Sequence, residues 1–370
     1  MSEIKLLLRK NIEKVKPYQP GKPISEVKRE LGLQRVIKLA SNENPLGPSP
    51  KAVRAILKSV SELHRYPESN CFYLKRKLAE RFNLKEDNFI IGNGSDEIIV
   101  LVLRALIDPG DKVMIAEPTF LIYEIQANAC GARVIKIPLR NFRYDLKRMK
   151  ENLTPEVKVV FIANPDNPTG TYVTEEEVKE FMENIPEKTF VFFDEAYYEF
   201  ASTLPDYPRS LQFLNKRNII ITRSFSKAYG LAGLRVGYGM GRADLIAYLE
   251  RIREPFNVNS LAQAGALSAL EDASFLKKTL ETTQEGKAYL YKEFEKLGLT
   301  YLPSATNFVL VDIGRDSERI FQQLLREGVI VRGLKPWGLD NFIRVTIGRR
   351  EENEKFIKAL KKVLRKGGKR

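Results

Sequence analysis

The chain has 370 residues, of which 43% are hydrophobic, and a formal net charge of +14. This length and composition suit a globular protein with two domains and a large shared core. The apolar runs are short and interrupted by charge, and residues 1–5 show no signal-peptide pattern, so we expect no membrane span, no export and a cytoplasmic location.

The positive charge raises the hypothesis of a nucleic-acid partner, because basic proteins are attracted to phosphate polymers. A good part of the excess lies in the C-terminal segment 351–370, which ends in a run rich in Lys and Arg. The pattern of this segment predicts an amphipathic helix followed by a basic tail in solvent. We therefore expect no nucleic-acid partner.

Metal and thiol chemistry is limited by composition. Cys71 and Cys130 are the two cysteines, and neither stands in a metal-binding or redox spacing, so free thiols are expected. His64 is the single histidine, which excludes sites built from several histidines. No metal is expected.

The order of predicted elements indicates an α/β fold. Strand-like runs alternate with helical patterns, as in a mostly parallel sheet covered by helices; they lie near residues 88–91, 112–116, 133–138, 158–163, 189–193 and 218–222. We assign residues 46–255 to this large domain. After Pro255 the pattern changes to long helices around 261–297 and strands at 307–311 and 342–346, which predicts a smaller α+β domain. It comprises residues 256–370 and is completed by residues 1–45.

The first strand end offers a phosphate site. Residues 88–91 run into a glycine-containing turn at 92–97, and an apolar helical run follows. Glycine lets the backbone approach a ligand closely, and the N–H groups of Ser95 and Asp96 at a helix start bind phosphate well. The alternative is a plain glycine turn followed by a helix N-cap.

The second strand, 112–116, is followed by Phe120. Its ring could cover one face of an aromatic cofactor by offset stacking. The alternative is an ordinary core phenylalanine.

The third strand, 158–163, ends at a loop that contains two Asn-Pro pairs within residues 164–168. Such a loop is irregular, and its Asn167 can direct an amide donor into a site. A structural turn is the alternative.

The fourth strand, 189–193, leads into Asp194 and, shortly afterwards, Tyr197. A carboxylate placed after an apolar strand is costly to bury without a cation, and a protonated pyridine nitrogen is such a cation. Tyr197 could donate a hydrogen bond to a ring phenolate oxygen, together with Asn167. The alternative for Asp194 is a helix N-cap.

The fifth strand, 218–222, precedes the motif that carries the most chemistry. Lys227 lies just past the strand end, where open α/β sheets bind their ligands, and a desolvated amine can form a Schiff base with an aldehyde. Ser224, Ser226 and Arg235 offer two hydroxyls and a guanidinium to a phosphate. The alternative is a turn with a solvated lysine.

Together these groups are the parts that pyridoxal phosphate needs, and their order and spacing resemble the fold-type-I pyridoxal-phosphate aminotransferases. The residues that carry this resemblance are Gly92, Ser95, Asp96, Asn167, Asp194, Tyr197, Lys227 and Arg235. More narrowly, the segments 17–23, 38–50, 65–67 and 341–348 resemble the histidinol-phosphate aminotransferases, and the similarity spans nearly the whole chain.

The resemblance implies histidinol phosphate as substrate and 2-oxoglutarate as amino acceptor. Arg344 is then the candidate for the α-carboxylate, although a solvated strand arginine is its alternative. Arg332 and Tyr18 are candidates for the substrate phosphate, and Asn44 resembles a residue near the substrate, with an Asn-Pro turn as its alternative. Tyr66 resembles the residue that reaches the cofactor phosphate of the opposite subunit, which implies a homodimer.

In the mechanism so implied, Lys227 holds the cofactor and then acts as a base at the substrate α-carbon, while Asp194 keeps the ring nitrogen protonated. Two other reactions share this cofactor set: an aromatic amino-acid aminotransferase and a threonine-phosphate decarboxylase. Phe256 stands where some members of the family carry tyrosine, and the missing hydroxyl keeps the choice of substrate open.

Overall fold

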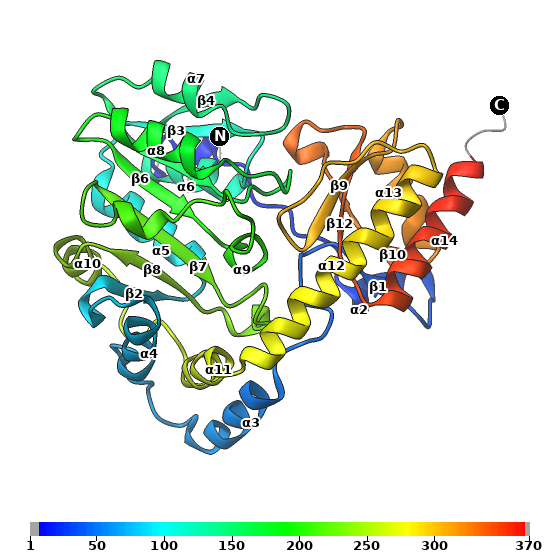
Figure 1. Cartoon of the computed structure of the whole chain (residues 1–370), viewed down its shortest axis with the longest axis horizontal. Helices are drawn as coiled ribbons and strands as arrows, with labels where there is room; N and C mark the ends of the chain where they lie inside the picture. The colour runs from blue at the N-terminus through cyan, green and yellow to red at the C-terminus, as the bar shows by residue number, and fades with distance from the viewer. Residues whose placement is uncertain (1–6, 367–370) are drawn as a thin grey trace.

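A computed structural model describes residues 7–366 of the chain. Two groups of elements lie beside each other in Figure 1, one built on a large sheet and one on small sheets. The predicted basic tail after residue 366, and residues 1–6 of the predicted small domain, lie outside the described residues.

The large group is built on a seven-stranded sheet with the order β2-β8-β7-β6-β5-β3-β4. Its strands are β2 (Phe89–Gly92), β3 (Lys112–Glu117), β4 (Arg133–Pro138), β5 (Val157–Ala163), β6 (Phe190–Asp194), β7 (Ile219–Ser224) and β8 (Gly237–Gly241). Strands β3 to β7 pair in parallel, while β8 runs antiparallel to both of its neighbours. The predicted α/β fold with a mostly parallel sheet is confirmed.

Strand β8 was not predicted, and its sequence explains why. Glycine alternates along it at 237, 239 and 241, which is unfavourable for a strand by propensity. The packing requires these glycines, since a Cβ on Gly237 would lie 2.6 Å from the Ser95 nitrogen and one on Gly239 3.0 Å from Ile220. The glycine face of β8 thus lets neighbouring elements approach closely.

Helices connect and flank these strands (Figure 1). They are α3 (Pro50–Ser59), η2 (Val60–Glu62), α4 (Phe72–Phe82), η3 (Glu86–Asn88), α5 (Ser95–Leu106), α6 (Leu121–Cys130), α7 (Leu146–Glu151), α8 (Glu175–Asn184), α9 (Tyr198–Ala201), η4 (Ser210–Phe213), η5 (Ala232–Leu234), α10 (Ala243–Glu250) and α11 (Ser260–Leu270). Local sequence sets several helix starts. Ser49 caps α3 ahead of a proline, and Thr174 and Glu177 form a capping box at α8.

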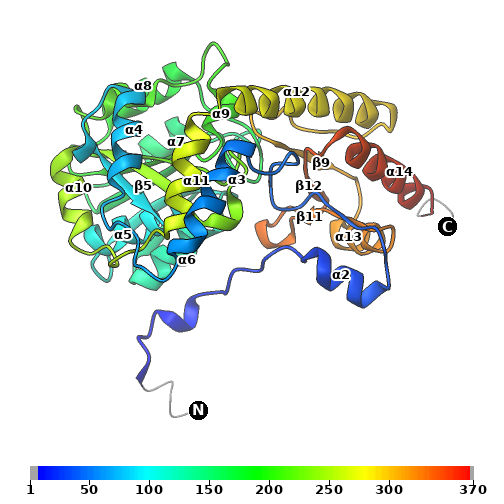
Figure 2. The ribbon, with the colours of Figure 1, turned by 90° about the horizontal axis from the view of Figure 1, so that it is seen from below.

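The small group contains an antiparallel sheet in the order β11-β12-β9 and a parallel pair of β1 and β10. Its elements are α2 (Ile24–Leu31), β1 (Ile37–Lys38), α12 (Ala273–Lys296), β9 (Phe308–Asp312), α13 (Ser317–Arg326), β10 (Val329–Ile330), β11 (Arg332–Gly333), η6 (Lys335–Trp337), β12 (Phe342–Thr346) and α14 (Arg350–Lys366). The short η1 (Ile12–Lys14) packs instead against α6 of the large group, where Asn11 Nδ2 donates to the Asn128 carbonyl over 2.8 Å. The long helix α12 extends from the large group along the small one, and the N-terminal segment leads up to α2 (Figures 1 and 2).

The apolar cores follow these two groups. One cluster fills both sides of the large sheet, and a second lies between β9, β12, α12 and α14. Helix α11 belongs to the first, because Ala262, Ala266 and Ala269 are buried there beside α3. The predicted boundary at residue 255 had placed α11 in the small domain. We propose instead that the boundary follows α11, near residue 271.

Within residues 7–366, no helix is both long and apolar enough to cross a membrane.

Candidate functional site

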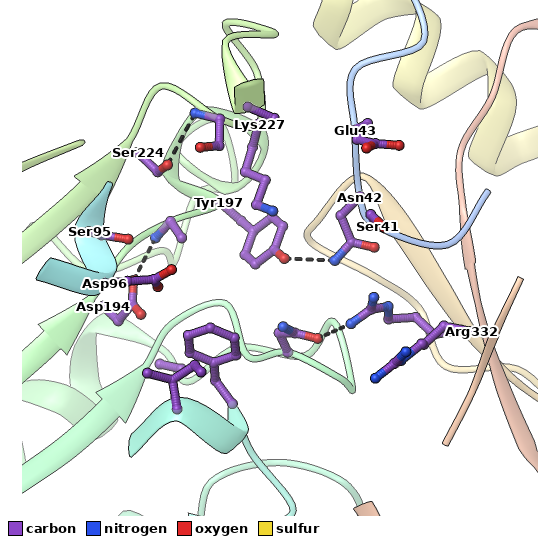
Figure 3. A pocket seen from close by; sticks show the side chains of 18 of the residues that line it. Ser41, Asn42, Glu43, Ser95, Asp96, Asp194, Tyr197, Ser224, Lys227 and Arg332 are labelled. Carbon is purple, nitrogen blue, oxygen red and sulfur yellow. Dashed lines mark hydrogen bonds between the residues drawn. The ribbon is translucent and has the colours of Figure 1, made fainter. Parts of the chain in front are cut away.

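A cavity of about 330 Å³ lies where the carboxyl ends of β5, β6 and β7 face strands β11 and β12. Figure 3 shows Ser95, Asp96, Asp194 and Ser224 on one side of it and Asn42 and Arg332 on the other. The cavity collects thirteen of the residues predicted from the sequence. They are Tyr18, Ser95, Asp96, Phe120, Asn167, Asp194, Tyr197, Ser224, Ser226, Lys227, Arg235, Arg332 and Arg344.

One end of the cavity is suited to a phosphate. Helix α5 begins at Ser95 after Gly94, which has a φ of 80° and makes no side-chain cap. The N–H groups of the first helical turn are therefore available to an anion. Arg235 lies against Gly94, where a Cβ would be 2.5 Å from its Nη2, and its Nη1 donates to Ser226 Oγ over 3.4 Å. Because Gly94 is the cap, the alternative of Ser95 as an N-cap does not hold.

Asp194 ends β6 as a buried carboxylate with three donors. Its Oδ2 accepts from the Tyr123 hydroxyl over 2.6 Å, and its Oδ1 accepts from the Ala196 N–H at 3.0 Å and from Thr222 Oγ1 at 3.4 Å. Burial raises the pKa of Asp194 to about 6, against the effect of the Tyr123 hydrogen bond. Helix α9 starts only at Tyr198, with Tyr197 as its cap residue, so Asp194 is not a helix cap.

Lys227 is a partly buried amine that points into the cavity toward Tyr197 (Figure 3). Its Nζ lies 5.7 Å from the centre of the Tyr197 ring, and within residues 7–366 it has no hydrogen-bond or ion-pair partner. Burial and, next, the nearby Arg344 lower the pKa of Lys227 to about 8. A larger fraction of this amine than of a free lysine is therefore neutral, and nucleophilic, near neutral pH.

Two donors flank the position in front of Lys227. Tyr197 is buried, which raises its pKa to about 12 and keeps the phenol protonated. Asn167 Oδ1 accepts from Arg344 Nη1, so the amide of Asn167 is left to donate elsewhere. Phe120 lines the same space and meets Tyr123 edge to face, with ring centres 5.5 Å apart.

The opposite wall carries two arginines. Arg344 on β12 donates from Nη2 to the Ala40 carbonyl over 2.8 Å, while its buried Nε has no partner. Arg332 on β11 donates to the Gln19 carbonyl and lies 5.2 Å from the Trp337 ring and 6.0 Å from the Tyr18 ring. Neither guanidinium forms an ion pair within the described part of the chain, and burial lowers the pKa of both.

Two predicted residues lie outside this cavity. Asn44 donates to the Ala228 carbonyl over 2.9 Å and to Thr279 Oγ1 over 3.0 Å, and its own oxygen accepts from the Leu46 N–H. These bonds occupy both N–H groups and the oxygen of its carboxamide, as in a turn residue, and leave Asn44 no free donor for a substrate. Tyr66 is 82% exposed and stacks on Phe256 with ring centres 4.6 Å apart.

Three functional candidates were missed by sequence reasoning. Tyr123 reaches Asp194 from inside α6, Trp337 donates from Nε1 to the Thr119 carbonyl over 2.8 Å, and Asn42 reaches the Tyr197 hydroxyl. Tyr123 and Trp337 look like ordinary core aromatics in the sequence. The polar run Ser41-Asn42-Glu43-Asn44 did signal a site, but only the fold distinguishes which of its asparagines faces the cavity.

Residues 34–360 match the model of the family Aminotransferase class I and II. The chain belongs to this family. The enzyme is 51% identical to the histidinol-phosphate aminotransferase of Moorella thermoacetica, over 96% of this chain and 92% of the relative. It is 46% identical to histidinol-phosphate aminotransferase 2 of Carboxydothermus hydrogenoformans, over 97% and 99% of the two chains.

The aminotransferase also resembles a solved structure from Sinorhizobium meliloti, a histidinol-phosphate aminotransferase in complex with pyridoxal-5'-phosphate. The TM-score is 0.90 at 29% identity, over 97% of this chain and 98% of the other. The donor set described above fits that cofactor chemically. A helix start, two serine hydroxyls and Arg235 suit its phosphate, Asp194 its pyridine nitrogen, Tyr197 and Asn167 its ring oxygen, and the free amine of Lys227 its aldehyde.

Proposed function

We propose that this aminotransferase transfers the amino group of histidinol phosphate to 2-oxoglutarate, with pyridoxal phosphate as cofactor, in histidine biosynthesis. The names of its full-length relatives support this reaction. The structural observation that carries it is the pair Arg332 and Arg344, two buried guanidiniums in the wall facing Lys227 that have no acidic partner within residues 7–366.

Unpaired buried cations require an anionic ligand, because burying a charge without a counterion is costly. An aromatic amino acid brings one carboxylate with a single negative charge into the cavity, whereas a phosphate ester brings about −1.5 to −2 near pH 7. Histidinol phosphate has no α-carboxylate, and its phosphate hangs from the carbon that would carry one, while 2-oxoglutarate brings two carboxylates. A site that must accept both substrates in turn therefore benefits from two arginines.

We assign a separate role toward the cofactor to each group of side chains in the cavity. When bound, pyridoxal phosphate supplies an electron sink for the pair of electrons left on the substrate α-carbon. We assign Lys227 Nζ to hold the cofactor aldehyde and then to move the proton at that α-carbon. Asp194 holds the proton on the ring nitrogen, while Tyr197 and Asn167 donate to the ring oxygen. Ser224, Ser226, Arg235 and the start of α5 fix the phosphate and thereby the cofactor's position.

We further infer a homodimer in which Tyr66 reaches the cofactor phosphate of the partner. This rests on the sequence resemblance together with the exposure of the α3 to α4 region, where Leu57, Leu63, Tyr66 and Tyr73 are each more than half exposed. Large apolar side chains gathered in one region are a common sign of a subunit interface.

Mixing two inactive variants tests the shared site. Tyr66→Ala and Lys227→Ala homodimers should each be impaired, whereas a mixed dimer carries one site with both lesions and one site with none. We expect activity to reappear on mixing, up to about one quarter of the wild-type value by random assortment. Light scattering gives the oligomeric state independently. No recovery from a fully exchanged dimer would contradict the contribution of Tyr66 across the interface.

Turnover of histidinol phosphate, phenylalanine and threonine phosphate by the same preparation tests the proposed reaction. We expect the highest kcat/KM for histidinol phosphate with 2-oxoglutarate, and no release of CO₂ from threonine phosphate. Preference for phenylalanine would replace the named substrate while leaving the aminotransferase chemistry intact.

A further inference from the structure

The hydroxyl of Tyr197 is contacted by a second polar residue from the opposite wall. Asn42 is 1% exposed, and its Nδ2 donates to the Tyr197 oxygen over 2.7 Å (Figure 3). Asn42 has a φ of 55°, a left-handed conformation that asparagine, aspartate and glycine adopt more readily than other residues. Its backbone is further fixed by Asn307, whose Nδ2 donates to the Asn42 carbonyl over 2.9 Å.

The orientation of the Asn42 carboxamide is set by Thr346 at the end of β12. The backbone N–H of Asn42 points at Thr346 Oγ1 over 2.9 Å, and the same Oγ1 lies 3.2 Å from Asn42 Oδ1. A backbone N–H can only donate, so Oγ1 accepts that bond and has its own proton available for Asn42 Oδ1. The NH₂ group of the carboxamide must then face Tyr197.

The direction of these bonds determines where the Tyr197 proton goes. Because the phenol oxygen accepts from Asn42, its O–H cannot be directed along the same line. No other acceptor for this O–H lies among residues 7–366, and the hydroxyl lines the cavity. The proton is therefore available to a ligand.

Thr346 itself is held by the small sheet. Its N–H donates to the Leu39 carbonyl over 2.9 Å, and β12 pairs with β9 along its whole length. The hydrogen-bond chain therefore starts in a rigid part of the small group and ends on a tyrosine of the large one.

We propose that Asn42 and Thr346 are positioning residues that aim the Tyr197 hydroxyl proton at the ring oxygen of the bound cofactor. This inference rests on the proposed cofactor and not on the identity of the substrate. A donor at the ring oxygen stabilises its anionic form. The absorbance of the bound cofactor changes with pH, and a stabilised anionic ring oxygen keeps the pH midpoint of this change low. A raised midpoint therefore reports that the donor is lost, and the measurement needs no substrate.

A substitution at Thr346 tests the proposal without introducing a charge. Thr346→Val keeps the shape but removes the hydroxyl, so the Asn42 carboxamide is free to turn and present its oxygen to Tyr197. The Tyr197 proton would then go to Asn42, and we expect the midpoint to rise by about one pH unit. Thr346→Ser retains the hydroxyl and should leave the midpoint at its wild-type value.

Asn42→Asp is the second variant, since aspartate also tolerates the left-handed conformation. A carboxylate has no N–H to offer, so Tyr197 must donate to it, and the midpoint should rise at least as far as in Thr346→Val. Asn353→Asp is the matched control: Asn353 is buried and bonds the Gly348 backbone through both carboxamide atoms, but it does not line the cavity. Its midpoint should not move.

The same variants in a Tyr197→Phe background separate effects that act through the Tyr197 hydroxyl from direct effects on the cofactor. If the chain acts through the phenol, Thr346→Val adds no shift there, and Asn42→Asp shifts the midpoint less than it does beside Tyr197. Unchanged midpoints in both variants, or equal shifts in the two backgrounds, would overturn the proposal. Histidinol phosphate turnover is measured separately, so a wrong substrate assignment leaves these spectra and their interpretation unaffected.

Discussion

The two walls of the cavity differ in how their charged groups are paired. The large-sheet wall carries Ser95, Asp194 and Lys227, and the small-sheet wall carries Arg332 and Arg344. On the large-sheet wall, Arg235 and Asp194 have partners: Arg235 is partly exposed and lies 3.3 Å from Asp96, and the Asp194 carboxylate receives three hydrogen bonds. The Lys227 amine differs from them, because it has no ion-pair partner within residues 7–366. On the small-sheet wall, Arg332 and Arg344 are buried and lack an acidic partner within residues 7–366. The first wall suits a ligand that stays bound, and the second suits anions that exchange during turnover.

This contrast has a physical cause. Many neutral donors and a helix start can hold one phosphate tightly without a large excess of charge. An exchanging substrate, in contrast, must find its counter-charge already in place, because the protein cannot rebuild a buried ion pair in each cycle at low cost. Variants on the two walls should therefore fail in different ways.

The largest effect is expected at Lys227. Lys227→Ala should lower kcat by more than about 10³-fold, because the nucleophile and the proton carrier are lost together. Borohydride reduction of the cofactor-loaded wild type, followed by peptide mapping, should place the cofactor on Lys227. Lys287→Ala is the control, since Lys287 is also buried but donates to the Ser304 carbonyl outside the cavity. A label on any lysine other than Lys227 would contradict the assignment.

Next in size is Asp194. Asp194→Asn should retain bound cofactor, because the phosphate site is untouched, yet lose about 10²- to 10³-fold in kcat, since a neutral amide cannot hold the charge of a protonated ring nitrogen. Cofactor absorbance and turnover measure the two separately. Asp272→Asn, which alters an aspartate that caps α12, should be close to wild type because asparagine caps equally well. A normal rate in Asp194→Asn would refute the role of the carboxylate.

The arginines of the small-sheet wall should separate the two substrates. Arg344→Ala should lower kcat/KM for both histidinol phosphate and 2-oxoglutarate by about 10²-fold, because this residue meets whichever anion sits beside the α-carbon. Arg332→Ala should weaken histidinol phosphate by about tenfold or more and 2-oxoglutarate much less. Arg143→Ala, outside the cavity, serves as control. Equal losses for both substrates in Arg332→Ala would argue against a phosphate-specific role.

The smallest expected effect is a shift in the pKa of Lys227, on the large-sheet wall, when Arg344 on the small-sheet wall is replaced. In cofactor-free protein, acylation of Lys227 by a small amine reagent should rise with pH around a midpoint of about 8, because only the neutral amine reacts. Arg344→Ala should move this midpoint upward, since removing a nearby cation favours the protonated amine. Peptide mapping gives the extent of labelling. A midpoint near that of a free lysine, or one insensitive to Arg344, would show that the two walls are electrostatically independent.

The large-sheet wall was predicted from the strand ends themselves, whereas Arg332, Arg344 and Tyr18 of the opposite wall were predicted from the family resemblance. Most of its residues end a buried strand or follow one within a few positions, and parallel strands bring their carboxyl ends to one edge. Ser95, Asp194 and Lys227 were found in this way, together with the mostly parallel sheet. The antiparallel β8 was not predicted, because its alternating glycines are poor strand formers. Only the close contacts with neighbouring elements make these glycines necessary.

The sequence by itself determined the local chemistry: which strands are buried, which polar groups end them, and which amine, carboxylate and hydroxyls stand in what order. The tertiary structure alone decided how the far wall meets them. Asn42 and Thr346 are 304 residues apart yet form a hydrogen-bonded pair, and Asn44 turns away from the cavity although it resembles a site residue. Contacts at that separation depend on how two groups of elements pack, and no local pattern in the chain encodes the direction of a side chain across such a junction.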